Sequence, residues 1–532
     1  LQDLSQNVTT GGHVWFYSPG GSVVGSSAGF DVGGLLLSAN DLTSFTAGSS
    51  GFTGDFAADP ASNASIQILA GAQINALANN SYVAVVAPRV VQEGTVRVDG
   101  AAAYVAAQGA TMTLNQGLFD IEVDAGTGDS NGIVHTGTTG GPASTGAGDN
   151  HGIYMVAVPK NQALTALLSG NAGFDTASDA SIENGVVVLS ANYNVAGNNQ
   201  VVGDLLFWGG GANAIDPLAA GAADWHINGG TFTSDIIGRA SRNIYMAGLN
   251  ESTTVHGDVT LIGREEAHIG ARNGHTITID GNATVSNGHS IIYRDYPAEA
   301  GRSLMYADAG SSLSIGGNAT IDAAVFGGEG LLGSGGEAGL HANGGTVAVG
   351  GDVNVDASGN AGTMPSTAIG LVHGGLATIQ AGSGGSIVIT GNAIANADGT
   401  GATILSGGNV GGSGLGGDVR VGASDATLTI NGNVVIGTGV GALSTTLFNA
   451  SGGGTLAVTN LAAGATFRAG GSSGSGNVTT ADLSGLGTLN VSLNTTDGVF
   501  RVNSTTATNV AGQSTLILAT DNTITAKTLA VG

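Results

Sequence analysis

One pattern recurs through the second half of this 532-residue chain and limits the folds open to it. An alternating apolar strand leads into a glycine followed by asparagine or aspartate, and a second alternating strand follows. The glycines stand at positions 257, 281, 317, 351, 391 and 432, so successive repeats lie 24, 36, 34, 40 and 41 residues apart. A drifting period is typical of a solenoid whose coils carry loops of different length. The segments are Val255–Leu261, Ile279–Val285, Ile315–Ile321, Val349–Val355, Ile389–Ile394 and Ile430–Ile436.

The repeat has a direct physical interpretation. Side chains alternate across a β-strand, so Val, Ile, Leu and Ala would point into the coil and Thr, Asn and Ser outward. One coil cannot bury its apolar face alone, and its stability therefore comes from its neighbours. We predict a positive φ at the corner glycines and local backbone hydrogen bonds from the Asn or Asp after each, with stacked asparagines forming a ladder between coils. The glycines in this prediction are Gly281, Gly317, Gly351, Gly391 and Gly432.

Composition supports an all-β chain. The 95 glycines and 8 prolines follow no three-residue period, which excludes collagen. A hydrophobic content of 42% excludes a disordered chain. Lysine occurs only at positions 160 and 527, so long helices are not expected. We therefore predict an all-β chain folded as a β-solenoid, expected to be a right-handed parallel β-helix with loop insertions.

Charge and cysteine content narrow the possible partners. A net charge of −25 argues against nucleic acid and against an anionic membrane surface as partners. The chain has no cysteine, so its stability would come from stacking and not from disulfides. No basic segment with an apolar core stands at the start, and we expect Leu1 to be a mature or trimmed start. Thr523–Gly532 still has a strand pattern, from which we expect a longer parent protein.

The stretch Gly12–Leu42 alternates short strands and tight turns. A bulky strand, Val14–Tyr17, runs into the turn Ser18–Gly21. A second strand begins at Ser22–Val24, and after a break of small residues comes the apolar run Val32–Leu37. Strands and turns at such short intervals predict a chain that winds around a solenoid.

These residues resemble the N-terminal secretion domain of filamentous-haemagglutinin-like exoproteins, the large bacterial adhesins exported by two-partner secretion. That family shows a VWLINPNG segment, an F-G break and then VNVGGL. The corresponding letters here are VWFYSPGG, VG and DVGGL, with Ser18 and Gly20 in place of the two asparagines. The residues that carry the resemblance are Trp15, Phe16, Pro19, Gly21, Gly33 and Gly34.

The resemblance implies a route of export. In that family an outer-membrane transporter barrel recognises the N-terminal domain, which then folds outside the cell and templates the coils that follow. It therefore implies that Gly12–Leu42 is the export segment. It also implies a secreted or cell-surface, outer-membrane-associated protein of a Gram-negative bacterium.

The two halves of the chain differ in regularity. We predict an N-terminal β-helix with irregular loops over residues 1–250 and a repetitive continuation of the same solenoid over residues 251–532. In the first half, Ser81–Val90 and Gly94–Tyr104 have strand patterns. The Gly/Ser/Thr-rich stretch Gly126–Asn150 predicts an exposed loop. Asn161–Ser169, with leucines at near-helical spacing, predicts a short surface or capping helix.

Basic residues gather in one region of the chain. If successive coils place them on one face, they would form a groove for an acidic glycan, with neighbouring carboxylates available for acid–base chemistry. The alternative is a surface ladder in which Arg pairs with Glu and Asp between coils. The candidate glycan-binding residues are Arg239, Arg242, Arg264, Arg272, Arg294 and Arg302.

No catalytic or metal-binding motif has a supporting context. The GxGxxG at Gly412–Gly417 lacks a βαβ unit, and the GxSxG at Gly470–Gly474 lacks a strand-to-helix elbow. Asp124–Gly132 could collect oxygen ligands for Ca²⁺, but its spacing matches neither an RTX repeat nor an EF-hand. We therefore assign no catalytic residue, no metal ligand and no cofactor, with Ca²⁺ the one ion left open.

These observations favour a non-enzymatic, secreted or cell-surface adhesin-like exoprotein. Its solenoid would act as an elongated rod that attaches to a host-cell, glycan or biofilm surface. Two alternatives stay open. One is a self-assembling extracellular filament or surface-layer subunit, in which uncapped ends stack head to tail. The other is a β-helical polysaccharide lyase or hydrolase that uses the region Arg239–Arg302.

Overall fold

The structure is a computed structural model, and within the residues that it describes the chain is an all-β parallel β-solenoid. It divides into two compact units, Leu1–Gly263 and Arg264–Gly532, each described here by itself. The described residues include no helix that is long and apolar enough to cross a membrane. The described residues are 12–531 without 49–50, 147–148, 161, 179–184, 203–221, 288–297, 300, 327–332, 361–362, 365–371, 398, 401–402, 405–413, 416–417, 425, 437–444, 450–453, 462–464, 470–477 and 503–512.

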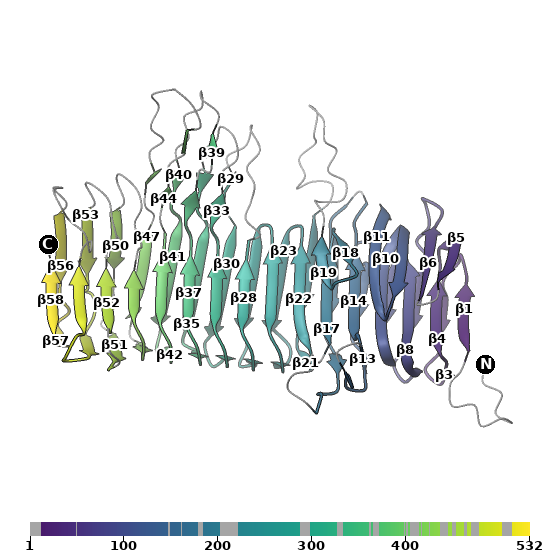
Figure 1. The fold of residues 1–532 in the computed structure, drawn as a ribbon, viewed down its shortest axis with the longest axis horizontal. Coiled ribbons are helices and arrows are strands. Elements are labelled where there is room, and N and C mark those ends of the chain that lie inside the picture. The colour runs from purple at the N-terminus through teal and green to yellow at the C-terminus, as the bar shows by residue number, and fades with distance from the viewer. Residues whose placement is uncertain are drawn as a thin grey trace. The chain divides into compact units, whose positions relative to one another are not determined.

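In the N-terminal unit each full coil contributes strands to three faces, and the strands of these faces pair in parallel with their equivalents in the next coil (Figure 1). Face 1 consists of β3 (Gly29–Asp31), the first part of β8 (Gln73–Ala87), the first part of β10 (Thr95–Asn115), β13 (Thr138–Gly141), β16 (Asn171–Phe174), β21 (Gly230–Phe232) and β24 (Thr253–Val255). Face 2 consists of β1 (His13–Tyr17), β4 (Gly34–Ser38), the second part of β8, the middle of β10, β14 (Gly152–Ala157), β17 (Val186–Ala191), β22 (Asp235–Ala240) and β25 (Val259–Gly263). Face 3 consists of β2 (Ser22–Val24), β7 (Ser65–Ile68), β9 (Arg89–Gln92), β12 (Ile133–His135), β15 (Leu164–Leu168), β20 (Ala223–Ile227) and β23 (Asn243–Gly248).

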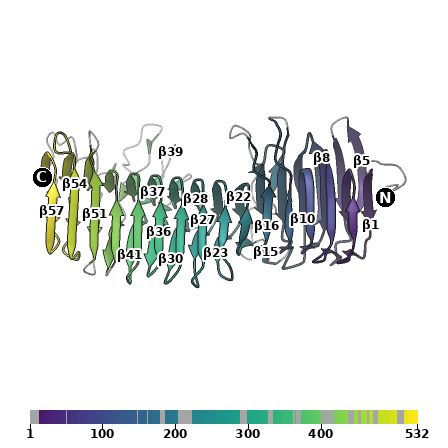
Figure 2. The same cartoon turned by 90° about the horizontal axis from the view of Figure 1, so that it is seen from below.

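The C-terminal unit has the same three faces, and Figure 2 shows the face 1 strands β51, β54 and β57 side by side. Face 1 consists of β27 (Thr276–Ile279), β31 (Ser312–Ile315), β36 (Thr346–Val349), β42 (Ser386–Ile389), β48 (Thr427–Ile430), β51 (Thr455–Asn460), β54 (Thr488–Leu493) and β57 (Asp521–Thr525). Face 2 consists of β28 (Ala283–Ser286), β32 (Ala319–Asp322), β37 (Val353–Asp356), β43 (Ala393–Asn396), β49 (Val434–Ile436), β52 (Thr466–Ala469), β55 (Val499–Val502) and β58 (Thr528–Val531). Face 3 consists of β26 (Glu266–Ala271), β30 (Arg302–Asp308), β35 (Glu337–Asn343), β41 (Leu376–Gly382), β47 (Asp418–Ser424), β50 (Thr445–Asn449), β53 (Val478–Asp482) and β56 (Gln513–Ile517).

Short strands in the loops of the C-terminal unit also pair in parallel from coil to coil. One sheet contains β29 (Ala298–Glu299), β34 (Gly333–Ser334), β40 (Val372–His373) and β46 (Gly414–Leu415). A second contains β33 (Val325–Phe326), β38 (Gly359–Asn360) and β44 (Gly399–Thr400), and a third contains β39 (Thr363–Met364) and β45 (Thr403–Ile404). The loop insertions predicted between repeats are therefore partly ordered by the same stacking.

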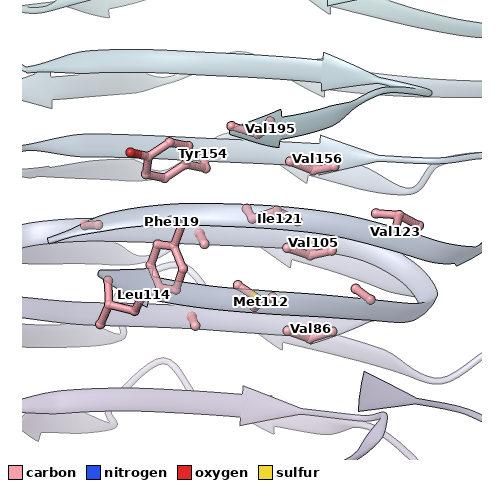
Figure 3. Packing of buried hydrophobic residues seen from close by; sticks show 14 of the residues in the cluster. Val86, Val105, Met112, Leu114, Phe119, Ile121, Val123, Tyr154, Val156 and Val195 are labelled. Atoms are coloured by element: carbon pink, nitrogen blue, oxygen red, sulfur yellow. The ribbon is translucent and has the colours of Figure 1, made fainter. Parts of the chain in front are cut away.

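An antiparallel layer covers face 2 of the N-terminal unit. Its strands run in the order β5 (Asp41–Gly48), β6 (Gly51–Ala57), the last part of β10, β11 (Leu118–Gly126), β18 (Asn194–Ala196) and β19 (Gln200–Val202). Figure 3 shows Phe119 of this layer between Leu114 and Tyr154, and all three are part of one buried cluster. Face 2 is thus buried on both sides, which explains the unbroken apolar run Tyr82–Ala87 in β8.

The repeat spacing read from the sequence is the coil length. Backbone pairing joins Ala283 to Ala319, Ala319 to Val353, Val353 to Ala393 and Ala393 to Val434 along face 2. Residues one coil apart are therefore 36, 34, 40 and 41 positions apart. Burial alternates along these strands as the inward and outward assignment requires.

A ladder of Asn and Asp side chains runs along the corner between faces 1 and 2 of the C-terminal unit. The backbone N–H of Asn318 donates to Oδ1 of Asn282 at 2.9 Å, and that of Asp352 to Oδ1 of Asn318 at 2.8 Å. The next two steps join Asn392 to Asp352 at 2.7 Å and Asn433 to Asn392 at 2.9 Å. Each carbonyl or carboxylate oxygen thus satisfies a backbone donor of the following coil, as the predicted ladder requires. In these four bonds the partner is the next coil and not the local backbone that the sequence predicted.

The predicted positive φ at the ladder glycines is wrong. Among the described residues, positive φ occurs at other glycines and at a few non-glycine residues, but not at Gly281, Gly317, Gly351, Gly391 or Gly432. Glycine is needed there for space. A Cβ on Gly351 would meet Oδ1 of Asn318 and the backbone of Gly317 in the preceding coil.

The positive φ lies at the turn that joins face 3 to face 1. Gly274, Gly310, Gly344 and Gly384 have φ values of 81°, 75°, 76° and 80°. A Cβ on Gly384 would meet nothing within 4 Å, so conformation alone selects glycine there. The two corners of a coil therefore use glycine for two different reasons.

The predicted helix over Asn161–Ser169 is also wrong, because Leu164–Leu168 is strand β15. Leu164, Ala166 and Leu168 alternate inward with a period of two, while Thr165 and Leu167 are partly exposed. Pairing with β12 and β20 on both sides satisfies the backbone of this segment. Stacking between coils thus outweighs the local helical spacing of the leucines.

The predicted exposed loop Gly126–Asn150 is only partly a loop. It contains β12 and β13, and these strands bury the polar side chains of His135 and Thr139. Thr139 Oγ1 lies 2.7 Å from the hydroxyl of Tyr104 and 2.9 Å from Nε2 of His135. Burial lowers the pKa of His135 to about 4, so its imidazole is neutral at neutral pH.

We expect the ladder glycine to be more sensitive to substitution than the turn glycine. In Gly351→Ala the new Cβ would press against Asn318 Oδ1 and the backbone of the preceding coil. The substitution should lower the free energy of unfolding by roughly 1–3 kcal/mol. Gly384→Ala meets no atom and should cost only its backbone strain, about 1 kcal/mol. Urea unfolding measures both. The double variant Gly351→Ala/Asn318→Ala should lose less free energy of unfolding than the two single variants lose together. Full additivity of the two losses would contradict the ladder.

Stability of the N-terminal unit should fall in acid through His135. Its pKa is about 4 when folded and 6.5 when unfolded, so the unfolded chain binds the proton first. The neutral His135 therefore contributes about 3 kcal/mol to the free energy of unfolding. This contribution is complete above pH 6.5 and is lost as the pH falls toward 4. Urea unfolding at pH 7.5 and 4.5 should show a smaller difference for His135→Gln than for wild type. An equal difference, or the same change in the exposed control His13→Gln, would contradict this.

Candidate functional site

The turn Ser18–Gly21 of the candidate export segment forms as the sequence predicts. The backbone N–H of Gly21 donates to the carbonyl of Ser18 at 2.9 Å, and Ser18 Oγ donates to the carbonyl of Gly21 at 2.6 Å. Gly21 has a φ of 88°, which favours glycine, and Pro19 is exposed at the tip. Pro19 and Gly21 therefore shape the link between β1 and β2.

Gly33 and Gly34 hold β4 close to its neighbours. The N–H of Gly33 donates to the carbonyl of Gly12 at 3.1 Å. Gly34 pairs with His13 on one side and Tyr82 on the other, and the two rings stack across it with centroids 5.4 Å apart. A Cβ on Gly34 would contact both rings, so this stacking requires glycine.

Trp15 anchors the first coil to the antiparallel layer. Its Nε1 donates to the hydroxyl of Tyr82 at 2.8 Å. Its ring meets Phe45 edge-on at 4.5 Å and lies 5.7 Å from Phe52. Phe52 in turn contacts Phe119, so an aromatic row leads from β1 into the core of the unit.

The same strand also leaves three aromatic side chains partly exposed. Trp15, Phe16 and Tyr17 are 37%, 49% and 52% exposed, and Phe16 has an edge-on contact with Phe30 at 6.0 Å. Val23 and Phe45 add exposed apolar surface nearby in sequence. Large apolar side chains at a surface mark a contact site when they are contiguous.

Sequence reasoning missed the partners of Trp15. Phe45 and Phe52 flank a hairpin whose small residues, AGSSG at 47–51, give a usable turn signal. Tyr82 lies 67 residues beyond Trp15, and only the coil pairing brings the two together. Burial raises the pKa of Tyr82, and the hydrogen bond from Trp15 lowers it in part.

Two of the six candidate arginines lie in the N-terminal unit. Arg239 places its guanidinium carbon 4.2 Å from the ring centroid of Tyr193. Arg242 donates through Nε to Oδ1 of Asp224 at 2.8 Å and through Nη2 to Oδ2, a bidentate pair. Asp224 also accepts from the backbone of Asn243, so this pair fixes the turn before β23.

In the C-terminal unit, Arg302 stands between two carboxylates on face 3. Strand pairing places it in register with Glu266 of the previous coil and Glu337 of the next. Its Nε donates to Glu337 at 2.8 Å, and its Nη1 lies 3.9 Å from Glu266. This is the ion-pair ladder that the sequence offered as the alternative to a groove.

The remaining arginines divide between paired, half-buried and undescribed positions. Arg272 lies 3.4 Å from Asp308 and 4.7 Å from the ring centroid of Tyr306. Arg264 is half-buried, and Arg294 lies outside the described residues. Arg242, Arg272 and Arg302 thus carry partners of opposite charge, and glycan binding by the six arginines stays a prediction.

The histidines beside the ion pairs of Arg302 (His268 and His341) add no charge at neutral pH. Burial lowers the pKa of His268 to about 4; Glu266 opposes the shift, and Arg302 and Arg272 add to it. Burial also lowers the pKa of His341, whose Nε2 lies 2.6 Å from Thr378 Oγ1. The charges on this part of face 3 are therefore those of the arginines and carboxylates.

One group of side chains among the described residues brings three metal-ligand atoms together. Asp99, Asp149 and His151 place these atoms within 4.8 Å of one another. The sequence-based assignment of metal ligands named none of them. Asp99 lies in a different coil, and Asp149 lies at the end of the 126–150 stretch, for which the sequence predicts an exposed loop.

No protein-family model matches the chain, and no curated protein matches it either. The class of protein is therefore defined by the fold: a parallel β-solenoid with an antiparallel layer over one face of its N-terminal unit.

Proposed function

We propose that this chain is a non-enzymatic, exported β-solenoid exoprotein that acts at or beyond the surface of a Gram-negative bacterium. The observation that carries the proposal is β1, whose aromatic side chains have two roles. Trp15 holds the first coil to Tyr82, Phe45 and Phe52, while Phe16 and Tyr17 stay about half exposed. An outer-membrane transporter barrel would contact the exposed pair during export.

The pairing within each unit suits a chain that folds as it emerges. Every strand of faces 1, 2 and 3 bonds to the equivalent strand one coil away, so a new coil needs only the finished coil before it. The absence of cysteine leaves no disulfide to lock the chain before transport. The first coil, fixed by Trp15 and by Gly34 between two rings, would serve as the template.

Attachment is the role that the outer surface supports. The outward positions of β27, β31 and β32 are Thr, Ser and one Asp, and the Asn/Asp ladder repeats polar side chains from coil to coil. Such repetition gives many weak, equivalent contacts to a host-cell, glycan or biofilm surface. The filament and lyase alternatives, like the glycan groove, stay predictions.

The export role of β1 can be separated from its folding role. Phe16→Ser/Tyr17→Ser removes exposed aromatics and should leave the urea midpoint of the purified protein nearly unchanged, because surface substitutions cost within about 0.5 kcal/mol. Secretion by the native bacterium should nevertheless fall at least about tenfold, which corresponds to about 1.4 kcal/mol of recognition.

The matched control is Leu77→Ser, which removes an exposed apolar side chain of β8 outside the candidate export segment. The ratio of supernatant to cell-bound protein is measured by immunoblot for both variants. Normal secretion of Phe16→Ser/Tyr17→Ser, or an equal loss in Leu77→Ser, would count against recognition through β1.

A further inference from the structure

Asp99, Asp149 and His151 link two neighbouring coils of the N-terminal unit. Asp99 lies in β10 at a register shift between Val98 and Gly100, and His151 directly precedes β14, which pairs with β10. Nε2 of His151 lies 3.1 Å from Oδ1 of Asp99 and 3.7 Å from Oδ1 of Asp149. The His151 side chain is fully buried, whereas those of Asp99 and Asp149 are 22% and 12% exposed.

Ser144 lies within hydrogen-bond distance of both His151 and the carbonyl of Asp149, so its hydroxyl can influence the tautomer of His151. Ser144 Oγ donates its hydrogen to the carbonyl of Asp149 at 3.2 Å. When it does so, its lone pairs face Nδ1 of His151, 2.8 Å away, and Nδ1–H can donate to Ser144. In this tautomer of the neutral imidazole, Nε2 carries a lone pair and faces the two carboxylate oxygens; in the other tautomer, Nε2–H donates to Asp99.

The two carboxylates are held in this position by other bonds. Oδ2 of Asp149 accepts from the backbone N–H and the hydroxyl of Thr145 at 2.9 and 3.1 Å, which leaves Oδ1 toward His151. The backbone N–H of Asp99 donates to Ser81 Oγ at 3.1 Å. The His151 ring stacks on Phe174 with centroids 4.5 Å apart and planes 14° apart, so its plane is fixed as well.

Three electron-pair donors that converge in this way suit a cation between them. We propose that Asp99, Asp149 and His151 bind a divalent transition-metal ion of the zinc type. Ligand atoms around tetrahedral Zn²⁺, at about 2.0–2.1 Å from the metal, lie about 3.3 Å apart, and 3.1 and 3.7 Å bracket that value. A nitrogen ligand disfavours Ca²⁺ and Mg²⁺, which take oxygen ligands.

The ion would cross-link β10 to the coil that follows it. Two aspartates neutralise its charge, and the partial exposure of Asp99 gives the site access to solvent and to a fourth ligand. A chain without cysteine thereby gains a cross-link that can form after export, when the ion is available. The inference stands on the site itself and holds whether or not β1 is recognised by a transporter.

Cobalt is the probe that reports the site directly, because Co²⁺ in a site of this kind absorbs visible light. The full chain is stripped with EDTA and titrated with Co²⁺, and the absorbance is followed. We expect one Co²⁺ per chain, displaced by Zn²⁺ and not by Ca²⁺ or Mg²⁺. Failure of the wild type to take up Co²⁺ would overturn the proposal.

Two variants separate metal binding from hydrogen bonding. Asp99→Asn keeps an oxygen that can accept a hydrogen bond from Nε2–H but removes the negative charge of the carboxylate. The variant should therefore fold normally and bind Co²⁺ at least about tenfold more weakly. His151→Gln should abolish uptake. The matched controls are Asp120→Asn, on the exposed side of β11, and His135→Gln, a buried histidine of the same unit; neither should change the affinity. Uptake unchanged in Asp99→Asn would overturn the assignment even if His151→Gln fails to fold.

Discussion

Hydrogen bonding between equivalent strands of neighbouring coils is the interaction on which both units depend. A strand of two to eight residues has no stability alone, and each face gains it only from the strand before and the strand after. This constraint fixes where the side chains lie. Arg302 meets Glu266 and Glu337 because register places them together, and Asn318 can accept from Asp352 because every coil turns the same corner.

The local pattern was enough to predict the architecture, since alternation and the glycine spacing report on neighbouring coils. Glycine spacings of 36, 34, 40 and 41 residues are the coil lengths seen in the pairing of Asn282, Asn318, Asp352, Asn392 and Asn433. The reason for glycine was not predictable in the same way. Whether Gly351 needs a positive φ or an empty Cβ position depends on the side chain of Asn318 in another coil.

The candidate site shows the same division. The turn at Ser18–Gly21 is local, and the sequence predicted it. The contact between Trp15 and Tyr82, and the convergence of Asp99 on His151, join residues 67 and 52 positions apart with no fixed spacing. The leucines of Asn161–Ser169 predicted a helix that does not form. Their near-helical spacing is a local signal, and backbone pairing with the two neighbouring strands outweighs it.

The N-terminal unit differs from the C-terminal unit in what it adds to the stack. Its antiparallel layer buries the outer side of face 2, an aromatic row ties β1 to that layer, and the proposed ion ties β10 to the next coil. These contacts reach beyond a single pair of strands. They add interactions that stacking alone does not supply, whereas the C-terminal unit depends on stacking and its Asn/Asp ladder.

Native-state hydrogen exchange of the wild type at increasing, sub-denaturing urea tests most directly whether stability is local to coils. Exchange is followed by mass spectrometry on peptides that each cover one coil of the C-terminal unit. The account predicts that groups of adjacent coils open at different urea concentrations and with different opening free energies. Convergence of all protected amides on one opening free energy would show a single cooperative core and contradict it.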